Sequence, residues 1–311
     1  MSWIKKGLIY CPNGSKNWAK HSFMTPTPLQ ISDEIIRIYG GMRDEKGVSR
    51  IGYVDVSSNN PSHVLNVSEV PVLDVGAPGR FDDNGVILGD ILRVGEDIWM
   101  YYIGFQLVQN VKFLAFTGLA ISKDGGESFQ RFQETPVMDR CQGSPHIRAI
   151  HSVIYEDGLF NVWFAIGKGS GWREIEGKTY PSYNIWHMQS KDGINFNSEE
   201  TLCIDTIGNE YRIGRPRVYK IENKYVMYYT RDFIERNYIA GFAESDNGVD
   251  WIRKDDYFPI QKSADGWDSK MTCYPVLLDF KSKKYMFYNG NNFGETGVGY
   301  AEKVSTIAKD S

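Results

Sequence analysis

Several acidic side chains of this sequence recur at comparable places, which makes them candidates for proton transfer. Asp83 and Glu210 occupy equivalent positions in two copies of an internal repeat, and Asp90 follows Asp83 by seven residues. Cleavage of a glycosidic bond uses two carboxyl groups, one as the acid and one as the base or nucleophile. These three residues are therefore the predicted catalytic carboxylates, and the alternative for each is a structural role.

Three arginines, Arg148, Arg215 and Arg217, belong to apolar segments that resemble buried strands. A guanidinium group recognises a carboxylate or a phosphate through two parallel hydrogen bonds. The arginines therefore predict an anionic sugar ligand, such as a sugar phosphate, nucleotide sugar, uronate or nonulosonate. The alternative is that they brace the fold through ion pairs with acidic residues. The acidic residues considered for such pairs are Asp44, Asp90, Glu210 and Asp232.

The elements that would position these side chains belong to a repeat. Residues 81–104 and 267–290 align without a gap, and matched pairs include Asp82 with Asp268 and Tyr102 with Tyr288. Residues 209–231 form a third copy. Repeats of this size are supersecondary units that bury their faces against their neighbours.

Each unit has an apolar strand, a turn and a strand rich in aromatic residues, which is the pattern of a β-sheet. Serine turns such as Ser122-Lys123-Asp124-Gly125 mark the outer hairpins and supply glycine at the positive-φ position. Units of four strands predict an all-β fold, a single-domain five-bladed β-propeller over residues 1–311. The expected blades cover roughly 25–75, 80–132, 146–196, 209–252 and 267–302, and residues 7–11 close the last one.

Composition narrows the class of protein. The chain has 311 residues, 41% of them hydrophobic, and a net charge of −4, which gives no indication of a nucleic-acid partner. No apolar run has the length of a signal peptide or membrane span, so we expect a cytoplasmic protein without a membrane partner. The four cysteines lack metal-type spacing and are expected to be free thiols. No motif predicts a cofactor or a metal, and the oligomeric state stays open.

The chain resembles the five-bladed propellers of glycoside hydrolase families 32, 43, 62 and 68, and more loosely family 130. The resemblance covers nearly the whole chain and rests on Phe81-Asp82-Asp83-Asn84-Gly85-Val86, on Trp99-Met100-Tyr101-Tyr102 and on the serine turns. It implies a catalytic Asp before a Pro on the innermost strands, at the narrow end of a central channel. The matching positions hold other residues here: Thr27, Leu88, Ile150, Arg215 and Tyr274.

Side chains alternate along a strand, so residues two positions from each matching position should also face the channel. This alternation predicts a channel lined by one carboxylate, several guanidinium groups and hydroxyls. The predicted lining residues are Thr25, Thr27, Asp90, Arg148, Arg215, Arg217, Thr272 and Tyr274. A shift of one residue in the third unit would present His151 in place of Arg148.

These observations predict hydrolysis or phosphorolysis of a glycosidic bond of a charged sugar, with Asp90 and either Glu210 or Asp83 as the acid and base. Arg148, Arg215 and Arg217 would hold the anion, and His151 could donate a proton. Residues 167–172 are expected to form a loop over the channel mouth, and several aromatic residues could stack on sugars: Phe105, Trp172, Tyr183, Trp186, Tyr211 and Phe293. The alternatives are a non-catalytic carbohydrate-binding or scaffold propeller, and a sialidase-like enzyme, which normally needs six blades.

Overall fold

The structure is a computed structural model that describes residues 2–167, 171–235 and 238–304. The described part is β-structure, with one short helix, α1 (Asn291–Gly294), and one 3-10 turn, η1 (Asp255–Tyr257). None of its helices is long and apolar enough to cross a membrane. The cysteines Cys11, Cys141, Cys203 and Cys273 all lie in the described part and are free thiols.

Most strands form antiparallel runs of four. The first run is β2 (His21–Gln30), β3 (Ile35–Arg43), β4 (Ser49–Ser57) and β5 (Asn60–Val67). The second is β6 (Val86–Val94), β7 (Asp97–Gln106), β8 (Leu114–Ser122) and β9 (Gln130–Arg131). The third is β10 (Ile147–Glu156), β11 (Leu159–Ile166), β14 (Asn184–Ser190) and β15 (Thr201–Ile204). A short parallel pairing of β8 with β10 joins the second and third runs into one sheet.

The fourth run is β16 (Glu210–Ile221), β17 (Lys224–Phe233), β18 (Ile239–Ser245) and β19 (Ile252–Arg253). The last is β20 (Cys273–Phe280), β21 (Lys283–Asn289), β22 (Val298–Val304) and β1 (Ser2–Tyr10). A separate hairpin is made of β12 (Trp172–Ile175) and β13 (Lys178–Pro181). Because β1 pairs antiparallel with β22, the N-terminal segment completes the last run, as the sequence predicted.

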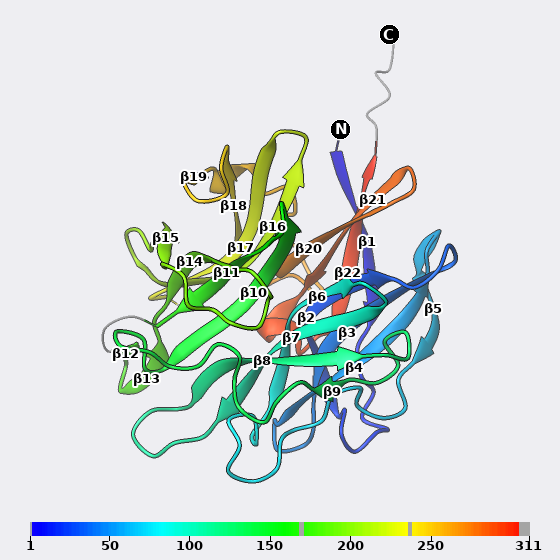
Figure 1. Cartoon of the computed structure of the whole chain (residues 1–311). Helices are drawn as coiled ribbons and strands as arrows, with labels where there is room; N and C mark the ends of the chain where they lie inside the picture. The colour runs from blue at the N-terminus through cyan, green and yellow to red at the C-terminus, as the bar shows by residue number, and fades with distance from the viewer. Residues whose placement is uncertain (1, 168–170, 236–237, 305–311) are drawn as a thin grey trace.

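The first strand of each run lies near the middle of the molecule, and the fourth strand lies at its periphery (Figure 1). These inner strands contact one another in the cyclic order β2, β6, β10, β16, β20 and back to β2. Their side chains therefore surround a common axis, and we call the space around this axis the channel.

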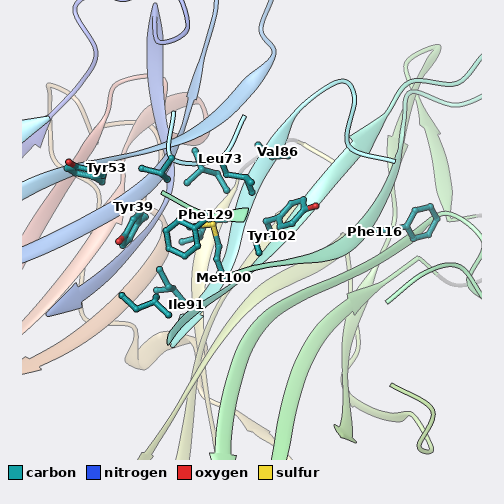
Figure 2. Packing of buried hydrophobic residues seen from close by; sticks show 14 of the residues in the cluster. Tyr39, Tyr53, Leu73, Val86, Ile91, Met100, Tyr102, Phe116 and Phe129 are labelled. Atoms are coloured by element: carbon teal, nitrogen blue, oxygen red, sulfur yellow. The ribbon is translucent and has the colours of Figure 1, made fainter. Parts of the chain in front are cut away.

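Each second strand is buried on both faces, because its side chains alternate between two neighbouring cores. On β7, Met100 and Tyr102 pack in one cluster with Tyr39 and Phe129, while Tyr101 packs in another. Figure 2 shows Tyr39, Phe129 and Met100 side by side between the first and second runs. This arrangement explains why the aromatic strands read as continuous apolar segments rather than as alternating ones.

The serine turns join the second, third and fourth runs each to the run before it. Ser122 Oγ accepts a hydrogen bond from Gly126 N, and the Gly126 carbonyl accepts one from the Tyr39 hydroxyl of the preceding run. The same contact recurs twice, as Tyr101 to Gly193 and as Trp163 to Gly248. These segments form the predicted turns, and the aromatic strands β3, β7 and β11 each carry a polar contact to the next run.

The two ends of the inner strands differ in their loops. Two-residue turns at 95–96, 157–158 and 222–223 join first strands to second strands, and we call this end the short-turn face. At the other end, 107–113, 167–183 and 290–297 join second strands to third strands, and we call this end the long-loop face. Loops on a rigid sheet scaffold commonly carry function, which favours the long-loop face.

Candidate functional site

Every inner strand contains a bulge at the same level of the channel. The pairing register breaks between Met24 and Thr27, Leu88 and Asp90, Ile150 and Ser152, Gly214 and Arg217, and Cys273 and Val276. In three of these strands the bulge holds a positive-φ residue followed by proline, namely Thr25, Arg215 and Tyr274, at φ 56, 55 and 54°. Thr25 is thus the position equivalent to Arg215, and the prediction of Thr27 for that place was wrong by two residues.

Arg215 is the central side chain of this level. It is 6% exposed, and its Nη1 donates hydrogen bonds to the Leu88 carbonyl and to His151 Nδ1, the latter over 2.9 Å. The ring of Tyr274 lies 5.4 Å from the Arg215 guanidinium carbon. Arg215 Nη2 has no hydrogen-bond partner among the described residues, and neither has Thr25 Oγ1 at the equivalent position on β2. Two buried polar atoms at the bulge level therefore lack a hydrogen-bond partner within the described part of the chain.

The charge of Arg215 is not neutralised within the described structure. No carboxylate pairs with it there, whereas Arg217 pairs with Asp90. Burial, together with the charge of Arg217, lowers the pKa of Arg215 to about 9. A buried cation without a counter-ion is costly, and an anion bound beside it would offset that cost. The geometry and charge of this position therefore suit a carboxylate or phosphate group.

His151 lies beside Arg215 and is buried. Its Nδ1 faces the Arg215 guanidinium, so that nitrogen must be unprotonated to accept the hydrogen bond. Burial, together with the charges of Arg215 and Arg217, holds the pKa of His151 well below its ordinary value. The imidazole is therefore neutral near pH 7, and it orients Arg215 rather than supplying an acidic proton.

Nearer the short-turn face, Arg217 contacts Asp90 and Thr27, two other residues predicted to line the channel. The three side chains form a brace between strands. Arg217 binds the Asp90 carboxylate through Nη1 and the Thr27 hydroxyl through Nη2. Asp90 also accepts hydrogen bonds from Ile91 N at 2.8 Å and Val153 N at 2.7 Å. These contacts link β2, β6, β10 and β16. Because both Asp90 oxygens are engaged, a structural role explains this carboxylate better than proton transfer.

Glu210 is placed far from Asp90, which corrects the predicted pairing of these two carboxylates. Glu210 and Arg217 are seven residues apart on β16, on the order of 20 Å along an extended strand. Glycosidase carboxyl pairs are separated by roughly 5–9.5 Å. The Glu210 side chain is 1% exposed and is held by Arg253, at 2.6 Å, and by Arg231. Glu210 therefore anchors the outer strands of the fourth run.

Arg148 does not line the channel, which corrects a second prediction. Its Nη1 donates to the Asp139 carbonyl at 2.8 Å, and its Nη2 pairs with Glu200, which precedes β15. The guanidinium carbon lies 5.8 Å from the ring of Phe164 on β11. The bulge at His151 reverses the expected alternation, so His151 faces the axis and Arg148 supports the third run.

Asp83 precedes β6, near the long-loop face, and is partly exposed. Its carboxylate accepts one hydrogen bond, from Gly79 N at 2.8 Å. It forms no ion pair with another described residue, unlike Asp90 and Glu210. Of the three predicted carboxylates, Asp83 is therefore the one whose oxygens stay accessible for proton transfer.

Aromatic rings gather beside Arg215 at the long-loop face. Tyr238 lies 5.8 Å from Tyr274 and 5.0 Å from Phe293, measured between ring centroids. The Arg212 guanidinium carbon lies 5.1 to 6.0 Å from four rings, those of Tyr183, Tyr211, Tyr238 and Phe293. Asp232 holds Arg212 at 2.6 Å, so this cluster is rigid. Tyr183, Tyr211 and Phe293 were predicted as sugar platforms, whereas no pattern in the sequence indicated Tyr238.

The other predicted platforms lie apart from this cluster. Phe113 lies 5.1 Å from Phe105 and 5.1 Å from Trp172, and together they form a second aromatic group. Trp186 donates its ring N–H to Asn184 and packs in the core of the third run. The predicted loop at 167–172 falls partly on residues 168–170, which lie outside the described residues. Among described side chains, no group of three or more metal-ligating residues could hold a metal ion.

The sequence is similar to curated proteins of Mycobacterium tuberculosis. The uncharacterized protein Rv1502 of strain H37Rv is 33% identical over 303 residues, which cover 97% of this chain and 99% of that protein. The uncharacterized protein MT1551 of strain CDC 1551 matches to the same extent. This chain belongs to their family. Models of known protein families were also compared with the chain, and none matches.

Solved structures identify the fold. A glycoside hydrolase superimposes with a TM-score of 0.72 at 18% identity, covering 97% of this chain and 91% of its own. A beta-1,2-mannobiose phosphorylase from Listeria innocua, in complex with beta-1,2-mannobiose, gives a TM-score of 0.70 at 13% identity, covering 97% of both proteins. A thermostable family-43 glycoside hydrolase gives 0.66 at 17% identity, covering 90% of this chain and 88% of its own. The fold of this chain is that of the propeller glycosidases, as the resemblance implied.

Proposed function

We propose that this protein is a carbohydrate-active enzyme that cleaves a glycosidic bond at the long-loop face and holds an oxyanion at Arg215. The observation that carries the proposal is the Arg215 guanidinium, which is buried, lacks a carboxylate partner in the described structure and keeps Nη2 free. The partly exposed rings of Tyr183, Tyr274 and Phe293 support it, because flat rings stack against the apolar faces of sugars. The likeness to the propeller glycosidases supports the reaction class.

We interpret the four-stranded runs as five blades of one propeller domain that spans the chain. The cyclic contacts of the inner strands support this count. The Tyr285 hydroxyl donates to the Ser58 carbonyl at 2.9 Å, which joins the last run to the first. The axis of such a ring is the natural place for a small ligand bound by residues from several blades.

The anion site favours phosphorolysis over hydrolysis by two carboxylates. Two of the three predicted carboxylates, Asp90 and Glu210, are held in ion pairs with Arg217 and Arg253. In a phosphorolysis, a phosphate oxygen attacks the anomeric carbon, the glycosidic C–O bond breaks, and one acid protonates the leaving oxygen. That reaction needs a cation for the phosphate and one protein acid. Asp83 is the predicted carboxylate left outside an ion pair, but it lies five residues before Leu88, on the order of 15 Å along the chain from the Arg215 contact.

A charged sugar, the other ligand predicted from the arginines, would use the same site differently. Its carboxylate or phosphate would bind Arg215, and water would act as the nucleophile. The two mechanisms differ in whether the rate depends on free phosphate and in whether the product is a sugar 1-phosphate.

The test is an assay of neutral and charged oligosaccharides with and without inorganic phosphate, with reducing sugar and sugar 1-phosphate measured separately. We expect phosphate-dependent release of sugar 1-phosphate, lost in Arg215→Met. Asp83→Asn tests whether the one predicted carboxylate outside an ion pair serves as the acid, whose loss would reduce the rate at least about a hundredfold. Arg93→Met is the matched control, because Arg93 is an exposed arginine that contacts the Gln30 carbonyl at the short-turn face.

Phosphate-independent cleavage of a charged sugar, with KM raised by Arg215→Met, would replace phosphorolysis by hydrolysis at the same site. Cleavage that is unchanged in Arg215→Met would contradict the anion site. If no oligosaccharide is cleaved but sugars bind, the protein is a carbohydrate-binding propeller, the class that the engaged Asp90 and Glu210 would suit.

A further inference from the structure

The channel holds a second space, separate from the position of Arg215. A cavity of about 360 Å³ lies between the bulge level and the short-turn face. All the inner strands contribute to its wall, through residues that follow the bulges. Arg217, Asp90 and Thr27 line it, and their mutual contacts cross the channel from β16 to β6 and β2. This bridge separates the cavity from the long-loop face.

We propose that this cavity is a second ligand site, which takes a neutral polyhydroxylated molecule of about the size of one sugar ring. Its volume is near the lower end of the roughly 300–1,000 Å³ that small-molecule sites span, which suits a ligand of one sugar ring. About half of the wall is aliphatic, with Ile91, Val153 and Val276 among its residues, and the rest is polar. Polar groups converge at the bridge and beside Tyr219, which is the usual composition of a small-molecule site.

The charges of the cavity decide the class of ligand. Both cations that line it have acidic partners, Arg217 with Asp90 and Lys220 with Glu156. A charged ligand would have to compete with one of these pairs. A hydroxyl group can instead donate to a carboxylate and accept from a guanidinium, so a neutral polyol is compatible with both partners.

Unused hydrogen-bonding capacity in the wall supports a hydroxylated ligand. The Tyr219 hydroxyl accepts a hydrogen bond from Leu277 N at 2.7 Å, and Ser152 Oγ accepts one from Val218 N at 3.0 Å. Each hydroxyl still has its own proton to donate. Arg217 is 4% exposed, and its Nε has no hydrogen-bond partner among the described residues. Empty apolar space beside unsatisfied buried donors is unfavourable, and a polyol would relieve both.

The experiment measures binding of glycerol, glucose, mannose and galactose by saturation-transfer NMR and calorimetry, with acetate as the charged comparator. Val276→Phe should fill the cavity and weaken polyol binding at least about tenfold, or about 1.4 kcal/mol. Val70→Phe is the matched control, because Val70 is 69% exposed and lies outside the cavity lining. Arg215→Met should leave this binding unchanged, which separates the site from the proposed active site.

Crystals of the wild-type protein soaked in the tightest-binding polyol give a second readout that does not depend on a variant. Density for the polyol between Val276 and Asp90 would support the proposal. The proposal is overturned if no neutral polyol binds, if Val276→Phe and Val70→Phe bind equally well, or if binding disappears in Arg215→Met alone. The last result would place the polyol at the long-loop face and would leave the proposed catalytic function standing.

Discussion

Replacing Arg215 by methionine should stabilise the ligand-free protein, although it removes two hydrogen bonds. Burial lowers the pKa of Arg215 from 12.5 to about 9, and each unit corresponds to about 1.4 kcal/mol. The buried charge therefore costs up to about 5 kcal/mol at pH 7. Methionine leaves the Leu88 carbonyl and His151 without their donor, which costs roughly 1–3 kcal/mol. We expect a net gain of about 2 kcal/mol.

Inorganic phosphate should stabilise the wild-type protein but not the Arg215→Met variant. If it binds beside Arg215, it stabilises the wild-type protein by mass action, by about 2.7 kcal/mol at a hundred times its Kd. Arg215→Met should lose this response completely. Urea unfolding at pH 7, with chloride at matched ionic strength in place of phosphate, measures both effects. Arg93→Met should change the free energy of unfolding by less than about 0.5 kcal/mol, because its side chain is exposed.

The reasoning fails if Arg215→Met is less stable than the wild type in chloride and phosphate stabilises neither protein. That result would mean that the fold itself satisfies the cation. A variant that is more stable but still responds to phosphate would move the anion to another position. Circular dichroism should first show that the variant keeps its β-sheet content.

Three further results follow from the contacts of named side chains. Glu210→Gln should lower the free energy of unfolding, measured in urea, by about 3–5 kcal/mol, because it removes one partner of the buried ion pair with Arg253. A variant with unchanged stability and lost activity would restore a catalytic role for Glu210. Asp90→Asn should destabilise to a similar extent by leaving the Arg217 charge unpaired, and thermal unfolding that matches the wild type would contradict the brace. Burial lowers the pKa of the His187 imidazole from 6.5 to about 4. The neutral ring therefore adds up to about 3 kcal/mol to the free energy of unfolding above pH 6.5, and this contribution is lost as the pH falls toward 4. In His187→Gln the free energy of unfolding should fall less steeply between pH 6.5 and 4, as measured by urea titrations at a series of pH values. Parallel curves of this free energy against pH for the two proteins would exclude His187 as the cause of the decline.

The sequence alone determined the architecture, because that information is local and repeated. The aromatic strands and serine turns specify hairpins, and a turn needs only a few adjacent residues to form. The pairing of β1 with β22 was also predictable, since the last unit lacked an outer strand. Contacts such as Tyr39 with Gly126 repeat from run to run, so the packing of neighbouring units followed from the repeat.

Only the tertiary structure decided which side chains face the channel and what they bind. A bulge adds one residue, and a shift of one residue moves every following side chain to the other face of the strand. The bulge residue His151 contacts Arg215, while Arg148, which precedes the bulge, lies beside Glu200. Ion-pair partners come from distant strands, as Glu210 shows with Arg253 of β19. Arg215 has a free donor for the same physical reason: which charges are paired depends on three-dimensional proximity, which the repeat pattern does not encode.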